Sequence, residues 1–394
     1  NLIKNRGPIS RTQIAREVRL SLATVSGVTA ALLKNGLIQP VGQGESSGGR
    51  KPVLLRLDPH AGYVVGLKVT EHRLICALAD LDANVIHRST FPFDAKPGVK
   101  AALDSIAQAI RTVVSESGIS LEKVIGAGIG LSGVIDGEAG ICRYSAILGW
   151  RDVKISEPLE KRLKLPVYVD NDVNTLTIAE QWFGYGREHD HFLVVTIGRG
   201  IGMGMVVNGQ FYRGAFGGAG EFGHTTVGED GPLCDCGKRG CLEAWAADPA
   251  VVRMAVESAQ RGESPGLARL LEEGGDGLTL DLVVGAADGG DGTAREILAR
   301  SGYCLGVGIA NLVSIFNPQL VIVGGEGVRA GEFRLGPMRE AIRQHAFNGL
   351  AQGLEIVIEP SGDDAWARGA ASLVLGEVFK SPIYRGEQIS LLAS

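Results

Sequence analysis

Residues 217–245 read GGAGEFGHTTVGEDGPLCDCGKRGCLEAW, and this glycine-rich stretch decides how the rest of the chain is interpreted. It contains one imidazole and three thiols, those of His224, Cys234, Cys236 and Cys241. Three cysteines and one histidine form an established ligand set of closed, tetrahedral structural zinc sites. The turn-forming residues 230–232 (DGP) between them let the backbone fold sharply around an ion. We therefore predict one structural zinc per chain, with no open coordination position and no hydrolytic role.

The alternative for these cysteines is a disulfide, or plain buried thiols. Cys234 and Cys236 are separated by one residue, which is too close for easy bridging. No signal peptide indicates an oxidising compartment, which would favour a disulfide. The chain begins with Asn1 instead of methionine, so we expect that further residues, a targeting segment among the possibilities, precede it.

Two motifs lie inside this stretch: residues 220–224 read GEFGH and residues 234–243 read CDCGKRGCLE. Together they resemble the signature of the ROK family, which contains repressors, open reading frames and kinases, and the resemblance extends over nearly the whole chain. It implies that the cysteines and the histidine hold zinc, while the glutamates and the same histidine line a sugar site. It also implies an actin-like ATPase (ribonuclease H-like) body of two α/β lobes around a cleft.

The resemblance identifies five candidate sugar-binding residues: Asn171, Asp172, Glu221, His224 and Glu243. Carboxylates and amides suit a polyol, because each accepts or donates two hydrogen bonds. His224 would then bind zinc through one ring nitrogen and face the ligand with the other. The alternative for Glu221 and Glu243 is that they are solvated loop charges. One position departs from the family, since Ile147 stands where a sugar-contacting asparagine is expected, and this leaves the identity of the sugar open.

The first 57 residues, which we call the head, differ in charge from the rest of the chain. They contain nine lysines and arginines against two glutamates, a net charge of +7. The whole chain carries −5, so residues 58–394 carry −12. A small basic unit on an acidic body is typical of a polyanion-binding module joined to another domain.

Within the head, the pattern predicts a winged helix-turn-helix. Ser10 caps a first helix, and residues 23–35 form a second helix with Val25, Val28, Leu32 and Leu33 facing inward. Residues 37–41 and 53–57 read as wing strands, and the second helix of such a unit enters the major groove. The predicted DNA contacts are Ser21, Thr24, Ser26 and Thr29 near the second helix, and Arg50 and Lys51 on the wing.

The alternative for the head is a basic helical hairpin that mediates only protein contacts. The segment, including the GGRKP wing at residues 48–52, also resembles the winged helix-turn-helix of ROK repressors, which ROK kinases lack.

From residue 58 onward the apolar pattern becomes that of an α/β fold. Strand-length apolar runs and helical periodicities alternate in two successive blocks. We expect strands over residues 63–69 and 167–170 and a helix over roughly residues 292–316, among others. We predict a first lobe over residues 58–170 and a second over 171–394. An alanine-rich helix at residues 366–375 is expected, by resemblance, to pack back on the first lobe.

The cleft chemistry distinguishes a sugar kinase from a sugar sensor. Asp172 resembles the general base of ROK kinases, although it reads equally well as a helix cap. Residues 68–73 (KVTEHR) stand where those kinases carry a first phosphate loop, Asp-x-Gly-Gly-Thr. Both glycines are absent, Lys68 replaces the metal-organising aspartate, and Glu71 would repel a phosphate. In the second loop, Arg199 replaces a threonine or serine. We therefore predict a non-enzyme with Asp172 as a vestigial base.

The sequence thus favours a sugar-responsive repressor of a carbohydrate-utilisation operon, acting on operator DNA and binding a sugar or sugar phosphate. Because helix-turn-helix proteins usually bind paired half-sites, we expect a homodimer or homotetramer. With 45% hydrophobic and 21% charged residues and no apolar run of membrane-spanning length, we expect a cytoplasmic protein without membrane contact. Two alternatives remain: an ATP-dependent sugar kinase with an added DNA-binding domain, and a regulator controlled by a protein partner.

Overall fold

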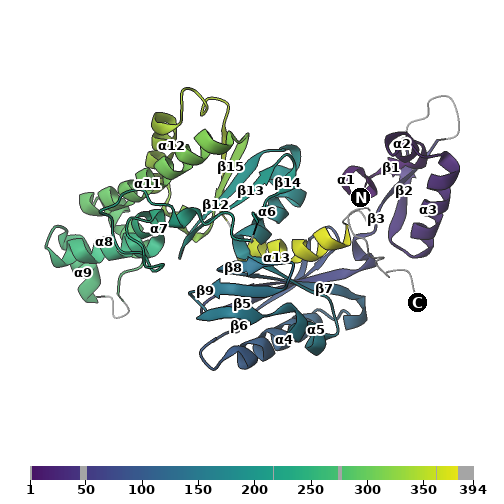
Figure 1. The fold of residues 1–394 in the computed structure, drawn as a ribbon, viewed down its shortest axis with the longest axis horizontal. Coiled ribbons are helices and arrows are strands. Elements are labelled where there is room, and N and C mark those ends of the chain that lie inside the picture. Colours follow the sequence, from purple (N-terminus) through teal and green to yellow (C-terminus); the bar gives the residue numbers. More distant parts are fainter. Residues whose placement is uncertain (1, 45–50, 216, 274–276, 361, 380–394) are drawn as a thin grey trace.

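The computed structural model describes residues 2–44, 51–215, 217–273, 277–360 and 362–379. Figure 1 shows the head beside one end of a body made of two α/β lobes. The yellow helix α13, Asp363–Val378, runs from between the lobes towards the head.

The head is a winged helix-turn-helix, as predicted. Its elements are α1 Leu2–Arg6, β1 Ile9–Ser10, α2 Arg11–Glu17, α3 Leu22–Lys34, β2 Ile38–Gln43 and β3 Val53–Leu57. The strands form a sheet in the order β1-β3-β2. The Ser10 and Ser21 hydroxyls accept hydrogen bonds from backbone amides at the starts of α2 and α3, which satisfies donors that a helix leaves unpaired. One detail was wrong: Val28 is 55% exposed and does not face the head core.

The first lobe is built on a five-stranded sheet with the order β11-β7-β4-β5-β6. Its strands are β4 Tyr63–Val69, β5 Arg73–Asp80, β6 Val85–Pro92, β7 Val124–Leu131 and β11 Val167–Asn171. Helices α4 Val99–Glu116 and α5 Ser156–Leu163 belong to this lobe, and Ile106 and Ile110 of α4 are fully buried against the sheet. A small sheet of β8 Val134–Asp136, β9 Ile141–Ser145 and β10 Trp150–Lys154 adjoins it.

The second lobe repeats this topology with the strand order β14-β13-β12-β15-β16. Its strands are β12 Phe192–Ile197, β13 Ile201–Val207, β14 Gln210–Phe211, β15 Leu320–Gly324 and β16 Glu355–Glu359. Its helices are α7 Leu242–Ala246, α8 Asp248–Gln260, α9 Pro265–Glu273, α10 Leu280–Asp288, α11 Gly292–Phe316 and α12 Glu332–His345. In both sheets an antiparallel meander of three strands is extended by two parallel strands. The predicted two-lobed, actin-like body is therefore confirmed.

Helix α11 is long and apolar enough to cross a membrane by length and composition. However, 61% of its apolar window is buried inside the protein. Gly302 and Gly306 let it approach α12 closely, because an added Cβ would meet the backbone oxygens of Arg334 and Met338. These contacts identify α11 as a core helix of the second lobe.

Two helices, α6 Asp172–Phe183 and α13, lie side by side and connect the cleft region with the head. Helix α13 packs directly on the first-lobe sheet, because Cβ atoms added at Gly66 and Gly128 would lie 1.9 Å from backbone oxygens of α13. At Gly369, α13 comes so close to α6 that an added Cβ would lie 3.1 Å from the Leu176 amide nitrogen. The small residues at these positions therefore permit tight helix–sheet and helix–helix packing.

Candidate functional site

A cleft between the two lobes, with a volume of about 960 Å³, is the candidate ligand site. Its size lies in the range of small-molecule pockets in proteins. The structure brings all five predicted sugar-binding residues to its lining, namely Asn171, Asp172, Glu221, His224 and Glu243. Ile147 also lines it, together with the apolar side chains of Val134 and Leu148. The cleft therefore presents both polar and apolar side chains.

Asp172, the first residue of α6, forms an ion pair with Lys68 from the end of β4. The Lys68 ammonium lies 3.6 Å from Asp172 Oδ2, and both side chains are largely buried. The same ammonium lies 3.2 Å from the ring centroid of Trp366 in α13. Asp172 Oδ1 accepts a hydrogen bond from the Val173 amide, 3.0 Å away. The carboxylate that resembles a kinase base is thus paired with a residue of the segment that stands in place of the first phosphate loop.

Asn171 is the residue that caps α6. Its Oδ1 accepts hydrogen bonds from the Val173 amide (2.8 Å) and the Asn174 amide (3.3 Å), and its Nδ2 donates to the Gly133 carbonyl (3.0 Å). The alternative in which Asp172 is the helix cap was therefore wrong. Because an amide nitrogen carries two hydrogens, Asn171 still has one donor for a ligand.

Glu221 and Glu243 both line the cleft, and Glu243 contacts the first residue of β13. Burial raises the pKa of the Glu221 carboxyl, His224 lowers it, and the charges of Glu243 and Asp172 raise it. Glu221 Oε2 lies 3.9 Å from His224 Nε2. Glu243 Oε2 accepts a hydrogen bond from the Ile201 amide at 2.9 Å. The hydrogen bond to Ile201 argues against the alternative of a freely solvated loop charge for Glu243. The Glu221 side chain is 45% exposed, so that alternative stands for Glu221.

The loop that carries Glu221 is anchored to the first lobe by a contact that sequence analysis missed. Arg213, just after β14, directs its Nε and Nη2 atoms at Asp170 Oδ2, at 2.9 and 2.8 Å. Asp170 is 1% exposed and also accepts a hydrogen bond from the Asn174 side chain. The acidic position at the end of a predicted strand was visible in the sequence, but its partner, 43 residues later, was not.

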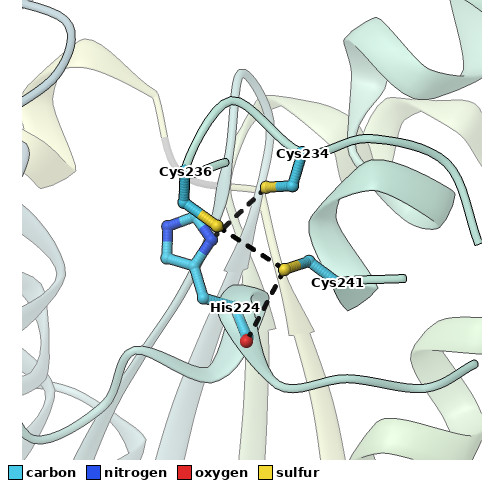
Figure 2. A group of neighbouring side chains, drawn as sticks. All are labelled: His224, Cys234, Cys236 and Cys241. Atoms are coloured by element: carbon cyan, nitrogen blue, oxygen red, sulfur yellow. Dashed lines mark hydrogen bonds between the residues drawn. The ribbon is translucent and has the colours of Figure 1, made fainter. Parts of the chain in front are cut away.

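The predicted metal ligands converge beside the cleft. Figure 2 shows His224, Cys234, Cys236 and Cys241 with their ligand atoms turned towards a common centre, and these atoms lie within 4.8 Å of one another. His224 Nδ1 lies 3.6 Å from Cys234 Sγ, and Cys236 Sγ lies 3.6 Å from Cys241 Sγ. For a tetrahedral zinc, ordinary bond lengths give S···N and S···S edges of about 3.6 and about 3.8 Å. The four side chains therefore fit a metal ion of this kind.

All six cysteines are free, which argues against the disulfide alternative. Burial raises the pKa of the Cys234 thiol to about 12, so a thiolate at this position needs a nearby cation. With Nδ1 facing the cysteines and Nε2 facing Glu221, His224 has the two-sided orientation that its predicted roles require.

Acidic groups and an ion-pair network line the side of the cleft where the resemblance to kinases would place a nucleotide. Arg199, in the loop between β12 and β13, lies 4.0 Å from Glu71 and 3.5 Å from Asp235. Glu326 lies against the same loop, since a Cβ added to Gly198 would be 2.6 Å from its carboxylate. Carboxylates at these positions would repel nucleotide phosphates.

The predicted DNA-contact residues differ in their exposure to solvent. Ser21 and Thr24 are exposed, but their hydroxyls hydrogen-bond each other at the start of α3, and Ser26 is half-buried. Thr29 was a wrong choice: it is 2% exposed, and its hydroxyl donates to the Val25 carbonyl and accepts from Arg11 Nε. Lys51 is exposed, whereas Arg50 lies outside the described residues. Sequence reasoning missed the exposed Leu22 and Val28 of α3.

Comparisons with known proteins agree with this architecture. The model of the ROK family matches residues 64–377, and the model of the MarR family matches residues 1–39. The chain is 31% identical over 376 residues to the xylose repressor of Caldicellulosiruptor bescii, covering 95% of this chain and 94% of that protein. It is 34% identical over 313 residues to the glucokinase of Halalkalibacterium halodurans, covering 79% of this chain and 94% of that protein.

Among solved structures, the chain resembles a ROK family transcriptional regulator described as a homologue of the E. coli MLC protein. The TM-score is 0.82 at 26% identity, with 95% of this chain and 93% of that chain covered. The similarity to repressors thus includes the head, whereas the similarity to the glucokinase is limited to 79% of the chain.

Proposed function

We propose that this chain, which belongs to the ROK family, is a sugar-responsive transcriptional repressor of carbohydrate-utilisation genes. The observation that carries the proposal is the union of a winged helix-turn-helix with a polar cleft whose would-be base, Asp172, is paired with Lys68. The similarity to a xylose repressor over 95% of the chain supports it. Operator DNA is its proposed partner, and a sugar or sugar phosphate its effector.

In this proposal, Asp172, Glu221 and Glu243 accept hydrogen bonds from sugar hydroxyls, while Asn171 donates its second amide hydrogen. The Nε2 face of His224 completes the polar wall. Because Ile147 lines the cleft, we expect the effector to place an apolar part of its ring or substituent against this side chain.

We further propose that the four clustered side chains hold one structural zinc ion. His224 Nδ1 and the thiolates of Cys234, Cys236 and Cys241 would be the ligands, and the ion would neutralise the thiolates and fix the loop. Because the same loop carries Glu221, the ordering of this loop also orders one wall of the cleft. A closed ligand set leaves the zinc no part in chemistry.

The similarity to a glucokinase favours one second candidate, an ATP-dependent sugar kinase. Phosphoryl transfer needs the nucleotide phosphates, their metal and the attacking hydroxyl to be held in line. Glu71 and Glu326 flank the loop that would approach the phosphates, and Lys68 holds the only candidate base we identify. These contacts support the proposal that the chain is not an enzyme.

We retain the division into a head over residues 1–57 and lobes over 58–170 and 171–394, with α13 returning to the first lobe. A repressor acts on DNA in the cytoplasm, and paired operator half-sites favour a homodimer or homotetramer.

The test combines a thermal-shift screen of pentoses, hexoses, amino sugars and their phosphates with operator binding. A ligand that binds only the folded state raises the melting temperature. We expect one sugar class to raise it and to weaken binding to a DNA fragment from the gene's own upstream region. A chain that binds DNA with no sugar response would contradict the sugar-responsive function, and sugar-dependent ATP turnover would establish the kinase.

A further inference from the structure

Lys4 of helix α1 places its amino group in an aromatic cage on the body. Nζ lies 3.7 Å from the ring centroid of Trp182, 4.1 Å from that of Phe379 and 5.0 Å from that of Phe183. It is buried and has no hydrogen-bond partner among the residues that the structure describes. A side chain of the head is thus inserted into the body, at a site that shares no residue with the lining of the ligand cleft.

This burial needs a compensating attraction. Burial lowers the pKa of the Lys4 amino group to about 7, while the charge of Asp82 acts in the opposite direction. A buried amino group without hydrogen bonds is unfavourable unless another interaction replaces its lost hydration. The negative faces of three aromatic rings supply that interaction, because they attract a cation most strongly where water is excluded.

The rings of the cage come from the ends of two helices. Trp182 and Phe183 are the last residues of α6, and Phe379 is the residue that ends α13. The rings of Trp182 and Phe379 lie 6.4 Å apart, within the range of aromatic pairs. The cage therefore exists only while the two helix ends keep this separation.

The opposite ends of the same two helices form part of the ligand cleft. Asp172 is the first residue of α6, Trp366 lies in the first turn of α13, and both contact Lys68. Between the two ends, Gly369 brings α13 against the backbone of α6. At each end of the helix pair, one lysine contacts both helices. Lys68 contacts α6 and α13 at the cleft, and Lys4 contacts them at the end near the head. Figure 1 shows α13 following this path from the lobes towards the head.

We propose that the Lys4 cage is the joint through which a ligand in the cleft controls the orientation of the head. This inference rests on the proposed function, because it requires an effector and an operator. A ligand that hydrogen-bonds Asp172 competes with Lys68 and changes how α6 and α13 meet in the cleft. The tightly packed helices transmit the change to their far ends, where the separation of Phe379 from Trp182 no longer fits the Lys4 side chain.

Release of Lys4 does not detach the head. Leu57, at the end of β3, packs into an apolar cluster with Val64 and Leu81 of the first lobe and Val374 of α13. The head then remains tethered but loses a fixed orientation, which paired heads on one operator require. Ligand and operator binding become coupled because each favours a different state of the cage.

The test uses the full chain with Lys4→Met, which keeps the length of the side chain and removes its charge. Arg6→Met is the matched control, since Arg6 lies on the same helix, is exposed and pairs with Glu17 outside the cage. Operator affinity is measured by fluorescence anisotropy with and without the sugar found by thermal shift. In Lys4→Met we expect operator affinity without sugar to fall about tenfold and the sugar response to shrink to about twofold or less. Sugar affinity should rise in Lys4→Met, because the ligand no longer has to break the cage. The operator affinity and the sugar response of Arg6→Met should stay near the wild-type values.

Phe379→Leu tests the cage from the other side and should lose the sugar response in the same way. Wild-type operator affinity together with a full sugar response in Lys4→Met would overturn the inference, as would an equal loss in Arg6→Met. Hydrogen exchange distinguishes a failure of this inference from a failure of the proposed function, because it needs neither sugar nor operator. Whether or not any sugar binds, Lys4→Met should speed exchange of the Gly7 amide, which donates to the Ile3 carbonyl at the end of α1, and unchanged exchange would show that the cage does not hold this helix.

Discussion

Lys68 Nζ lies 3.6 Å from Asp172 Oδ2, so the segment that stands in place of the first phosphate loop contacts the residue that resembles a catalytic base. The contact also includes the face of Trp366, which places the lysine between the starts of α6 and α13. The Lys68 ammonium is paired with this carboxylate, and Lys68 stands at the position where the resemblance expects the metal-organising aspartate of a kinase. Hydroxyl groups of a ligand can replace the Lys68 ammonium as the partner of the Asp172 carboxylate. This pairing supports the proposal that the cleft binds a ligand without phosphoryl transfer.

The first prediction concerns Asp172. Asp172→Asn keeps the size of the side chain but removes the charge that attracts Lys68 and the second acceptor for sugar hydroxyls. We expect sugar affinity to fall about tenfold, which corresponds to the loss of one hydrogen bond to a charged group. Isothermal titration with the inducing sugar measures the change. Neither the wild type nor the variant should turn over ATP in a coupled assay, and turnover abolished by this substitution would instead show a kinase.

The second prediction concerns the stability of the Lys68 pair. Lys68→Met leaves the largely buried Asp172 carboxylate without its partner, which is more costly than removing both charges. We expect unfolding to require about 2 kcal/mol less free energy, measured by urea denaturation. The double variant Lys68→Met with Asp172→Asn should recover part of this loss. If the double variant is less stable than the wild type by the sum of the two single effects, the two side chains do not interact.

The third prediction concerns the metal centre. Protein purified without chelators should contain about one zinc per chain, because the cluster supplies all four ligands. Cys236→Ser should lower the zinc content and weaken sugar binding, since the loop also carries Glu221. Cys304→Ser is the control, because Cys304 is half-buried and lies outside the cluster. Elemental analysis measures the zinc content, and thermal shift measures sugar binding. A wild-type chain without zinc would contradict the proposed zinc site.

The fourth prediction concerns the wing. Lys51 is exposed at the described edge of the wing, next to β3, where it can neutralise a phosphate. Lys51→Ala should weaken operator binding and reduce the slope of log affinity against log salt by about one. Lys123→Ala, an exposed lysine of the first lobe, should change neither quantity. An equal effect of both substitutions would mean that the body, not the head, determines the electrostatic attraction.

The fold could be predicted where the apolar pattern was long and regular. The expected strand over residues 63–69 and the helix over residues 292–316 coincide with β4 and α11. The small sheet β8–β10 was not expected, because its strands are short and mix polar with apolar residues. Thr29 was misassigned for a related reason: helical periodicity gives the approximate face of a residue, and a threonine hydroxyl can be satisfied by its own helix.

The cleft was only partly readable from the sequence. Local motifs named five of the polar residues that line the cleft, because each motif is contiguous in the chain. The contacts that decide its chemistry are long-range ones. Lys68, Asp172 and Trp366 come from three distant segments, and the Lys4 cage joins α1 to the ends of α6 and α13. No local periodicity carries that information, since it arises from how the sheet and the two helices pack.

The fifth prediction tests the packing between α6 and α13. At Gly369 an added Cβ would lie 3.1 Å from the backbone of Leu176, so a larger side chain must push the two helices apart. We expect Gly369→Val to lower the free energy of unfolding by roughly 2 kcal/mol, as overpacking of a tight contact does. Gly376→Val is the matched control on the same helix, because no atom lies within 4 Å of a Cβ added there. Urea denaturation of both variants measures the difference. Equal stabilities would mean that the helix pair yields at Gly369 without cost, and a pair that yields so easily could not carry a displacement from Asp172 to the Lys4 cage.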